Sequence, residues 1–153
     1  IATICALYMI SLAQFWMGRD VKYADELTEV IRANAQITVD KVNQLLERAD
    51  PGKPHIVASG WRPSAVNEAT SNAAATSKHL SGEAVDIADP DRALADWCSA
   101  GQHDLIDLGL WCEDFRWTPT WVHFQIVPPK SGRRIYIPSL AKPLDPDYPV
   151  TWA

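Results

Sequence analysis

The chain has 153 residues, 47% of them hydrophobic, with 14 basic against 19 acidic side chains and a formal net charge of −5. This length suits one domain with one core, and the hydrophobic content argues against disorder. Nucleic-acid binders normally present a basic face, so the acidic balance argues against a nucleic-acid partner. We therefore predict that residues 1–153 form a single domain without internal repeats.

Residues 1–17 carry no charge, which raises the question of a signal peptide or a membrane span. The segment lacks a basic n-region, Gln14 interrupts it, and it is shorter than the roughly 20 apolar residues that a spanning helix needs. We therefore expect no stable membrane insertion and see no clear export signal. Residues 11–17 instead predict a short packed helix with Ser11 as its N-cap. Met9 is an alternative start of the native chain, with residues 1–8 then lying upstream of it.

Residues 24–49 predict a longer helix, because apolar side chains recur there at helical spacing. Residues 38–40 could bend or divide this helix, and the turn at residues 50–54 ends it. A short apolar strand is expected at residues 55–59. Residues 61–78 look irregular and have little to bury, so we expect them to lie over a site.

The second half of the chain alternates short strands with helices. Strands are predicted at residues 83–88, 110–112 and 121–127, a helix at 92–100, a turn of helix at 104–108, and a strand-like stretch at 134–137 within an otherwise extended, proline-rich tail at 128–153. This order predicts an α+β fold, in which a small antiparallel sheet carries the site and the N-terminal helices pack against it.

The three cysteines, Cys5, Cys98 and Cys112, show no CxxC spacing. An odd set of this kind suits neither a disulfide framework nor a zinc knuckle. Buried or incidental thiols are the simpler interpretation, and folding in a reducing compartment fits them best.

Two segments bring together side chains that bind metals. His79 and Asp86 lie seven residues apart, and His123 lies in the separate strand-like segment Trp121-Val122-His123-Phe124-Gln125. Two imidazoles and one carboxylate form a ligand set for zinc, with the fourth position left to water as in catalytic sites. Any one of the three would more often be an ordinary surface or core residue, but the combination favours a metal.

The neighbours of Asp86 support this prediction. Asp86 stands in the apolar segment Ala84-Val85-Asp86-Ile87-Ala88, where a buried carboxylate is costly unless it is paired or bound to a metal. Side chains two residues apart on a strand share a face, so the small side chains of Ala84 and Ala88 would leave room for an ion.

Seven tryptophans are a high count for this length. Four of them crowd around the candidate site in the sequence: Trp61, Trp111, Trp117 and Trp121. They are compatible with plain packing or with an aromatic wall of a substrate cleft. Trp121 and Gln125 share the strand face of His123, and we predict that both contact the substrate.

Three strings of residues, in this order, resemble a known family. They are Ser59-Gly60-Trp61-Arg62-Pro63, the SxHxxGxAxD string at residues 77–86, and Trp121-Val122-His123. They are similar to the zinc D-alanyl-D-alanine carboxypeptidases, a family that includes vancomycin-resistance dipeptidases and phage endolysin peptidases. Lysostaphin-type enzymes and the hedgehog signalling domain share its fold. The resemblance extends over about residues 59–138 and implies that His79, Asp86 and His123 bind Zn²⁺.

The resemblance also implies roles for Arg62 and Ser77. Arg62 matches a family arginine that holds a substrate carboxylate or the developing oxyanion, a task that suits the planar fork of a guanidinium. An exposed charge after a turn is the alternative. Ser77 matches a position near the substrate amine, and an ordinary turn serine is an equally good interpretation.

The general base departs from the family pattern. Many members carry a glutamate three residues before the last ligand histidine, where this chain has Thr120. Glu113 and Asp114 end the preceding strand, and neighbouring antiparallel strands could bring Glu113 close to His123. We favour Glu113 as the base because its side chain is longer, although a solvated loop acid is the alternative.

Together these features predict a zinc-dependent peptidase that hydrolyses stem peptides of bacterial peptidoglycan. The bond is either of the D-Ala-D-Ala carboxypeptidase type or of the L-Ala-D-Glu endopeptidase type. The alternative, motivated by Thr120 and by the hedgehog domain, is a zinc-containing module that binds peptidoglycan or a protein without hydrolysis. A monomer is expected. Residues 128–134 resemble the phage and prophage branch, which implies cytoplasmic synthesis followed by phage-type release and action in the periplasm or cell wall.

Overall fold

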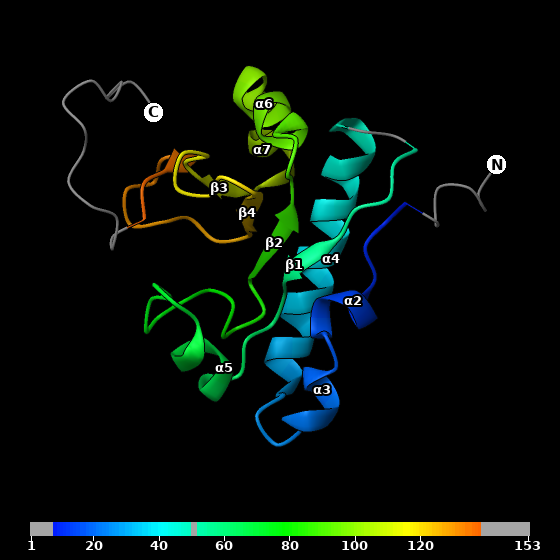
Figure 1. Cartoon of the computed structure of the whole chain (residues 1–153), viewed down its shortest axis with the longest axis vertical. Helices are drawn as coiled ribbons and strands as arrows, with labels where there is room; N and C mark the ends of the chain where they lie inside the picture. The colour runs from blue at the N-terminus through cyan, green and yellow to red at the C-terminus, as the bar shows by residue number, and fades with distance from the viewer. Residues whose placement is uncertain (1–7, 50–51, 139–153) are drawn as a thin grey trace.

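A computed structural model of the chain describes residues 8–49 and 52–138, and shows helices packed with a five-stranded sheet (Figure 1). This confirms the predicted α+β class. The strand order is β1-β2-β4-β3-β5, with β1 Val57–Ser59, β2 Ala84–Ala88, β3 Trp111–Glu113, β4 Trp121–Gln125 and β5 Ile135–Tyr136. Neighbouring strands are antiparallel except β3 and β5, which are parallel. The parallel pair makes the sheet mixed. It forms because the chain after β4 passes β3 and places β5 at the outer edge.

The helices of the described residues lie before β1 and between β1 and β3 in the chain. They are α2 Leu12–Trp16, α3 Arg19–Lys22, α4 Glu29–Ala49, α5 Ser64–Ala69, α6 Ala93–Ala100 and α7 Gln102–Leu108. The helix predicted at residues 92–100 is confirmed as α6. Among the described residues, none of the helices combines the length and the apolar character needed to span a bilayer.

The predicted N-cap of the first helix is confirmed. The Ser11 hydroxyl accepts a hydrogen bond from the Gln14 backbone N–H at 3.1 Å, and the Gln14 side chain accepts one from the Ser11 N–H at 2.7 Å. This reciprocal pair is a capping box, which satisfies two N–H groups that have no partner inside the helix. The helix ends at Met17 in the left-handed conformation (φ 55°), and Gly18 (φ 73°) opens α3.

The long helix α4 differs from its prediction in two ways. It begins at Glu29 rather than at residue 24, after Thr28 caps it by accepting from the N–H of Ile31 at 3.2 Å. It also runs unbroken through residues 38–40, so the predicted division is wrong. The Thr38 hydroxyl lies 2.9 Å from the carbonyl oxygens of both Asn34, one turn earlier, and Gly82, which share its single proton, and the helix stays intact.

The segment at residues 61–78 is not irregular throughout, since it contains α5. This helix buries only Asn67, so its sequence shows no apolar period. Its first backbone N–H, at Ser64, donates to the Glu26 carboxylate at 2.9 Å. That partner comes from far away in the chain, and a local sequence pattern cannot reveal it.

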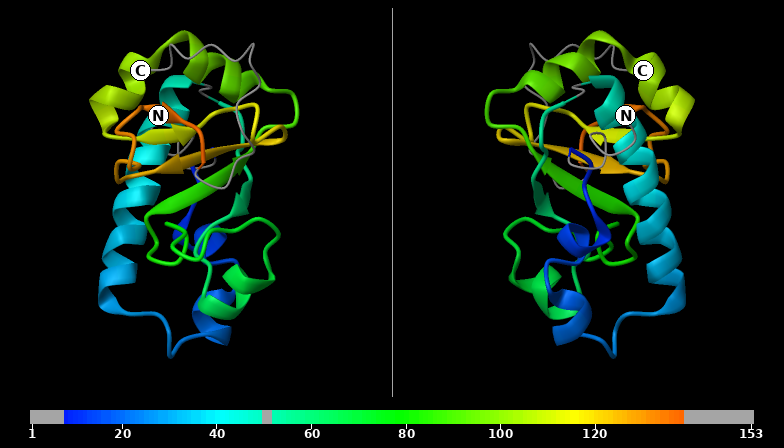
Figure 2. Two further views of the ribbon diagram at one scale, coloured as in Figure 1. Left: turned by 90° about the vertical axis from the view of Figure 1, so that its left-hand side faces the viewer. Right: turned by 90° about the vertical axis from the view of Figure 1, so that its right-hand side faces the viewer.

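The two faces of the sheet have different surroundings. Residues alternating along β2 and β4 place Val85, Ile87, Val122 and Phe124 on one face, and all four are fully buried. Val39, Val42, Leu45 and Leu46 of α4, with Leu94 of α6 and Leu105 of α7, belong to the same core. Figure 2 shows α4 running along one side of the sheet. The opposite face of the sheet carries the polar side chains that make up the candidate site.

Cys98 and Cys112 are buried free thiols, as predicted. Cys5, most of the upstream segment at residues 1–8 and the tail from residue 139 lie outside the described residues. The strand-like stretch predicted at residues 134–137 is confirmed as β5.

Candidate metal centre

Strand pairing brings two of the candidate ligands together. In the β2–β4 pair Asp86 lies directly opposite His123, and side chains of opposite residues project from the same face. His79 lies in the turn that precedes β2. One ligand atom from each of the three side chains lies within 4.8 Å of the others, and all three residues are buried. The structure therefore assembles the three residues into a group that could hold a metal ion.

The turn that contains His79 is braced by α4. The Asn34 amide donates to the Ser81 carbonyl at 3.0 Å, and the Gly82 carbonyl shares the Thr38 hydroxyl proton at 2.9 Å. Gly82 has φ 74°, and a Cβ there would lie 2.8 Å from the Ile31 carbonyl oxygen. Only glycine meets both conditions without strain, so the helix and the turn can approach closely enough for these two hydrogen bonds.

The hydrogen bonds of His79 define which ring nitrogen faces the centre. Its Nδ1 lies 2.8 Å from the Gly60 carbonyl oxygen, which can only accept, so Nδ1 carries the proton. Its Nε2 then bears a lone pair. This atom is buried without a hydrogen-bond partner and lies 3.3 Å from Asp86 Oδ1, which is also an acceptor. A cation placed among these atoms would satisfy them, so the donor set fits a metal.

The two oxygens of Asp86 have different partners. Oδ1 lies 3.3 Å from His79 Nε2 and 2.8 Å from His123 Nδ1, whereas Oδ2 accepts from the Arg62 guanidinium at 3.1 Å. Arg62 Nε also donates to the Ser59 hydroxyl at 3.0 Å. Only one carboxylate oxygen therefore faces the two imidazoles.

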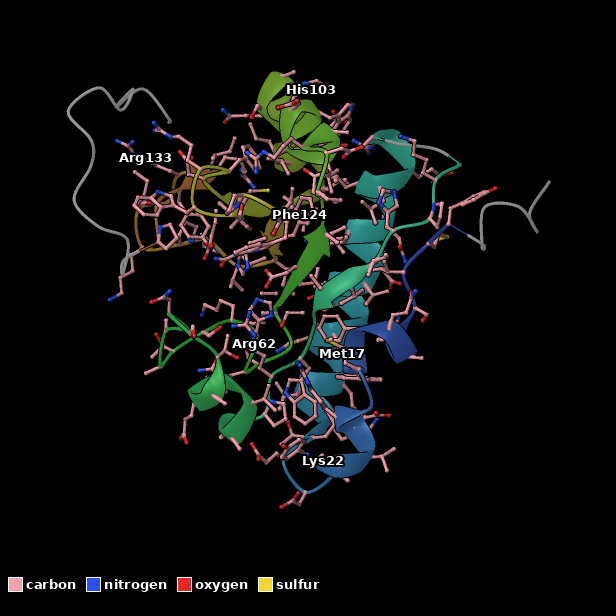
Figure 3. The ribbon with its side chains drawn as sticks, in the orientation of Figure 1. Met17, Lys22, Arg62, His103, Phe124 and Arg133 are labelled. Carbon is pink, nitrogen blue, oxygen red and sulfur yellow. The ribbon has the colours of Figure 1, made fainter. Side chains whose placement is uncertain are left out.

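Arg62 is not the exposed turn charge of the alternative interpretation, because only 9% of the residue is exposed. Figure 3 shows Arg62 between β2 and α5. The arginine thus lies next to the candidate ligands rather than on an outer turn.

The three ionisable groups shift one another's pKa. Burial acts to raise the pKa of Asp86, but the two imidazoles outweigh it and hold that pKa below its usual range. Burial lowers the pKa of His79. Burial opposes the charged form of His123 as well, yet the Glu113 carboxylate and the bond to Asp86 raise its pKa to about 9. Without a metal, Asp86 is therefore ionised at neutral pH and His123 holds a proton.

Glu113 lies on the same face of the sheet as His123. The β3–β4 register pairs Cys112 with Phe124, so the next step along the antiparallel strands brings Glu113 opposite His123. The effect of its charge on the pKa of His123 agrees with this position. Asp114 lies in the following turn, where it is 3% exposed and accepts from the Arg116 backbone N–H at 3.0 Å.

The remaining predicted site residues differ in how far they are available to a ligand. Trp121 is half-buried on the metal-facing side of β4, opposite Ala88. The half-buried Ser77 accepts from the His79 backbone N–H at 3.3 Å, as in a local turn. Gln125 is 4% exposed, and its amide is hydrogen-bonded within the protein.

Two of the four tryptophans have clear packing roles. Trp61 is 1% exposed and packs edge-on against Trp16, with ring centroids 5.9 Å apart. Trp111 stacks under the guanidinium of Arg134 at 4.2 Å. For Trp61 the packing interpretation therefore holds.

Sequence reasoning missed Tyr136, whose hydroxyl donates to Gln125 Oε1 at 2.6 Å. It also missed the bracing residues Asn34 and Thr38. Tyr136 belongs to a strand of two residues whose partner is β3, and no spacing rule connects it to β4. The only signal in the sequence was an aromatic residue within a short β-branched stretch.

The family model described as Peptidase M15 matches residues 20–117, which is more than half of the chain. The matched region includes His79, Asp86 and Glu113 and ends before His123, which strand pairing adds to the centre. No curated protein and no solved structure matches the chain.

Proposed function

Because this chain belongs to the peptidase M15 family, we propose that it is a zinc-dependent peptidase acting on the stem peptides of bacterial peptidoglycan. Family membership supports a metallopeptidase in general. The observation that supports the proposal most strongly is the buried group of His79, Asp86 and His123, in which the His79 Nε2 acceptor has no hydrogen-bond partner.

The chemistry of the donor set favours zinc. Imidazole nitrogens with one carboxylate oxygen suit Zn²⁺, whereas Mg²⁺ and Ca²⁺ prefer sites built from oxygen ligands. His79 would bind through Nε2, Asp86 through Oδ1 and His123 through Nδ1, and three protein ligands leave one position open. When bound, zinc supplies Lewis acidity, which polarises a scissile carbonyl and lowers the pKa of a water molecule.

Glu113 is the proposed general base. From its place beside His123 it would accept the proton of the attacking water and deliver it to the leaving amine. Thr120, at the position where many related enzymes carry the base, is exposed and has no ionisable group. We prefer Glu113 to Asp114, because Asp114 accepts a hydrogen bond inside its own turn.

Arg62 has donors left for the substrate. Its guanidinium has five N–H groups, and the contacts with Ser59 and Asp86 leave others free to bind a substrate carboxylate or a developing oxyanion. Trp121 would flank the reacting bond, and Ser77 would lie near the substrate amine. We further propose that the enzyme acts as a monomer in the periplasm or cell wall after phage-type release.

Defined murein peptides test the proposal. The protein, first stripped of metal by a chelator and then supplied with zinc, is incubated with them, and the fragments are identified by mass. We expect zinc-dependent cleavage, and the fragment masses distinguish a D-Ala-D-Ala bond from an L-Ala-D-Glu bond. Glu113→Gln should lower the rate by about 10²–10⁴-fold. Glu29→Gln, a matched change at an exposed residue of α4, should leave it unchanged.

Tight binding of the murein peptides with no cleavage by the zinc-loaded wild type would contradict the peptidase assignment. That result would favour the binding module instead.

A further inference from the structure

We infer that Gln125 and Tyr136 are positioning residues that hold His123 in the tautomer whose Nδ1 is free to bind a metal. The inference rests on the proposed metal centre but not on peptidase activity. It assigns Gln125 a contact with the metal ligand His123 in place of the predicted contact with substrate.

The orientation of the Gln125 amide follows from its neighbours. One of its terminal atoms lies 2.6 Å from the Val127 carbonyl oxygen, which can only accept, so this atom is the NH₂ group. The other atom is therefore Oε1. It accepts from the Tyr136 hydroxyl at 2.6 Å and lies 3.3 Å from His123 Nε2.

This orientation determines the tautomer of His123. An amide oxygen cannot donate a hydrogen bond, so His123 Nε2 must carry a proton in order to bond Gln125 Oε1. In the metal-free protein the charged ring also has a proton on Nδ1, which Asp86 Oδ1 accepts at 2.8 Å. When a metal displaces that proton, Nε2 keeps its own and Nδ1 offers its lone pair. The other neutral tautomer would donate from Nδ1 to Asp86, which blocks the metal-binding nitrogen, and would set the Nε2 lone pair against the Gln125 oxygen.

His79 shows the same arrangement with a different partner. A backbone carbonyl, that of Gly60, accepts from its Nδ1 and leaves Nε2 for the metal. Each imidazole therefore uses one nitrogen for an acceptor in the protein and presents the other to Asp86. Such outer partners orient the ligand ring and determine its tautomer.

Tyr136 is suited to hold the amide in place. It is 8% exposed, and burial together with the charge of Glu113 raises the pKa of its hydroxyl above the usual range, so the phenol remains a donor. In the parallel β3–β5 pair Tyr136 lies next to Glu113. The edge strand β5 thus connects to a metal ligand through Gln125, although β4 and β5 both lie outside the region that matches the family.

The test measures zinc affinity by competition with a chromophoric chelator. Gln125→Leu removes the acceptor at similar size and should weaken zinc binding by about 10–100-fold. Gln125→Glu keeps an acceptor for the Nε2 proton but loses the bond to the Val127 carbonyl, so it should bind zinc more tightly than Gln125→Leu. Tyr136→Phe should weaken binding less, within about tenfold. Tyr23→Phe, a matched change on the α3 side of the molecule, should have no effect.

Ring ¹⁵N NMR of the zinc-loaded protein gives a second readout that a purely structural role would not change. We expect the His123 proton on Nε2, slowly exchanging in the wild type and rapidly exchanging in Gln125→Leu. A proton found on Nδ1 in the zinc-loaded wild type overturns the inference, as does wild-type affinity in Gln125→Leu. If Gln125→Leu does not fold, the comparison of Tyr136→Phe with Tyr23→Phe decides, and equal affinities overturn the inference.

The two proposals fail differently in these experiments. A wild type that binds no zinc overturns both. A wild type that binds zinc without cleaving murein peptides contradicts the peptidase assignment alone, and the Gln125 variants still decide the inference.

Discussion

At the scale of single residues, the carboxylate of Asp86 links the metal ligands to Arg62. Oδ1 faces the two histidines and Oδ2 faces the guanidinium, so each oxygen has its own partner. A buried carboxylate that loses one partner is costly, because water cannot replace the partner. Arg62 therefore has a structural role in addition to its proposed contact with substrate.

Replacing Arg62 tests this structural role. Arg62→Ala should lower the free energy of unfolding of the metal-free protein by about 3–5 kcal/mol, the usual cost of breaking a buried ion pair from one side. Urea denaturation measures the change. The loss should be smaller with zinc bound, since the cation also balances the charge of Asp86. Arg32→Ala, which removes a largely exposed pair with Glu29, should cost less than about 1 kcal/mol. Equal losses in both variants would contradict the prediction.

The raised pKa of His123 predicts the pH dependence of metal binding. A metal must displace the proton that His123 holds below about pH 9, so protons and zinc compete. Zinc affinity should rise about tenfold for each pH unit between pH 7 and pH 9 and then level off. Isothermal titration calorimetry in buffers of different ionisation enthalpy measures both the affinity and the released proton.

Glu113→Gln provides the control for this pH dependence. It removes a charge that raises the pKa of His123, so the levelling should move to a lower pH. An affinity that is independent of pH across this range would contradict the assigned protonation.

At the scale of elements, α2 and the segment after β1 meet at Gly60. A Cβ at Gly60 would lie 1.9 Å from the Phe15 carbonyl oxygen, and the same glycine supplies the carbonyl that accepts from His79. The short N-terminal helix therefore determines where a bond partner of a metal ligand lies. Its N-cap, Ser11, was readable in the sequence, but this contact was not.

Gly60→Ala should disturb both the packing and the metal centre. The added methyl group must displace α2 or the Gly60 carbonyl, and overpacking of this kind costs about 1–3 kcal/mol or more. Zinc affinity should fall as well, because His79 loses the acceptor that fixes its ring. Gly132→Ala, where no atom lies within 4 Å and only the positive φ is strained, should lower stability without changing zinc affinity. Unchanged zinc binding in Gly60→Ala would refute the link.

At the scale of the whole molecule, the centre connects parts that are distant in the chain. His79 comes from a turn braced by α4, Asp86 from β2 and His123 from β4. A ligand that binds only when these parts are together stabilises the folded state.

Zinc should therefore raise the melting temperature of the protein. At a free concentration of 100 times its Kd, zinc contributes about 2.7 kcal/mol, which corresponds to about 5–10 °C for a chain of this size. Differential scanning calorimetry with and without a chelator measures the shift. His79→Ala, which lacks one ligand, should show little of it. An equal shift in wild type and His79→Ala would place the stabilising zinc elsewhere.

Much of the fold and part of the site were determined by the sequence alone. Helical and alternating patterns predicted α6, β2 and β4, because these periods reflect which side of an element is buried. The spacing of His79 and Asp86, with His123 on a strand, predicted which side chains could meet. The helix α5 escaped prediction because it buries a single residue and its first N–H, that of Ser64, donates to Glu26, far away in the chain.

Only the tertiary structure decided what surrounds those ligands. The register that sets Asp86 opposite His123, the pairing of Arg62 with Asp86 and the contact of Tyr136 with Gln125 all join residues from different elements. A periodic pattern records the burial of one element at a time and contains nothing about which residue of another element lies opposite. Those contacts arise when the strands align and the chain after β4 passes β3 to reach the edge of the sheet.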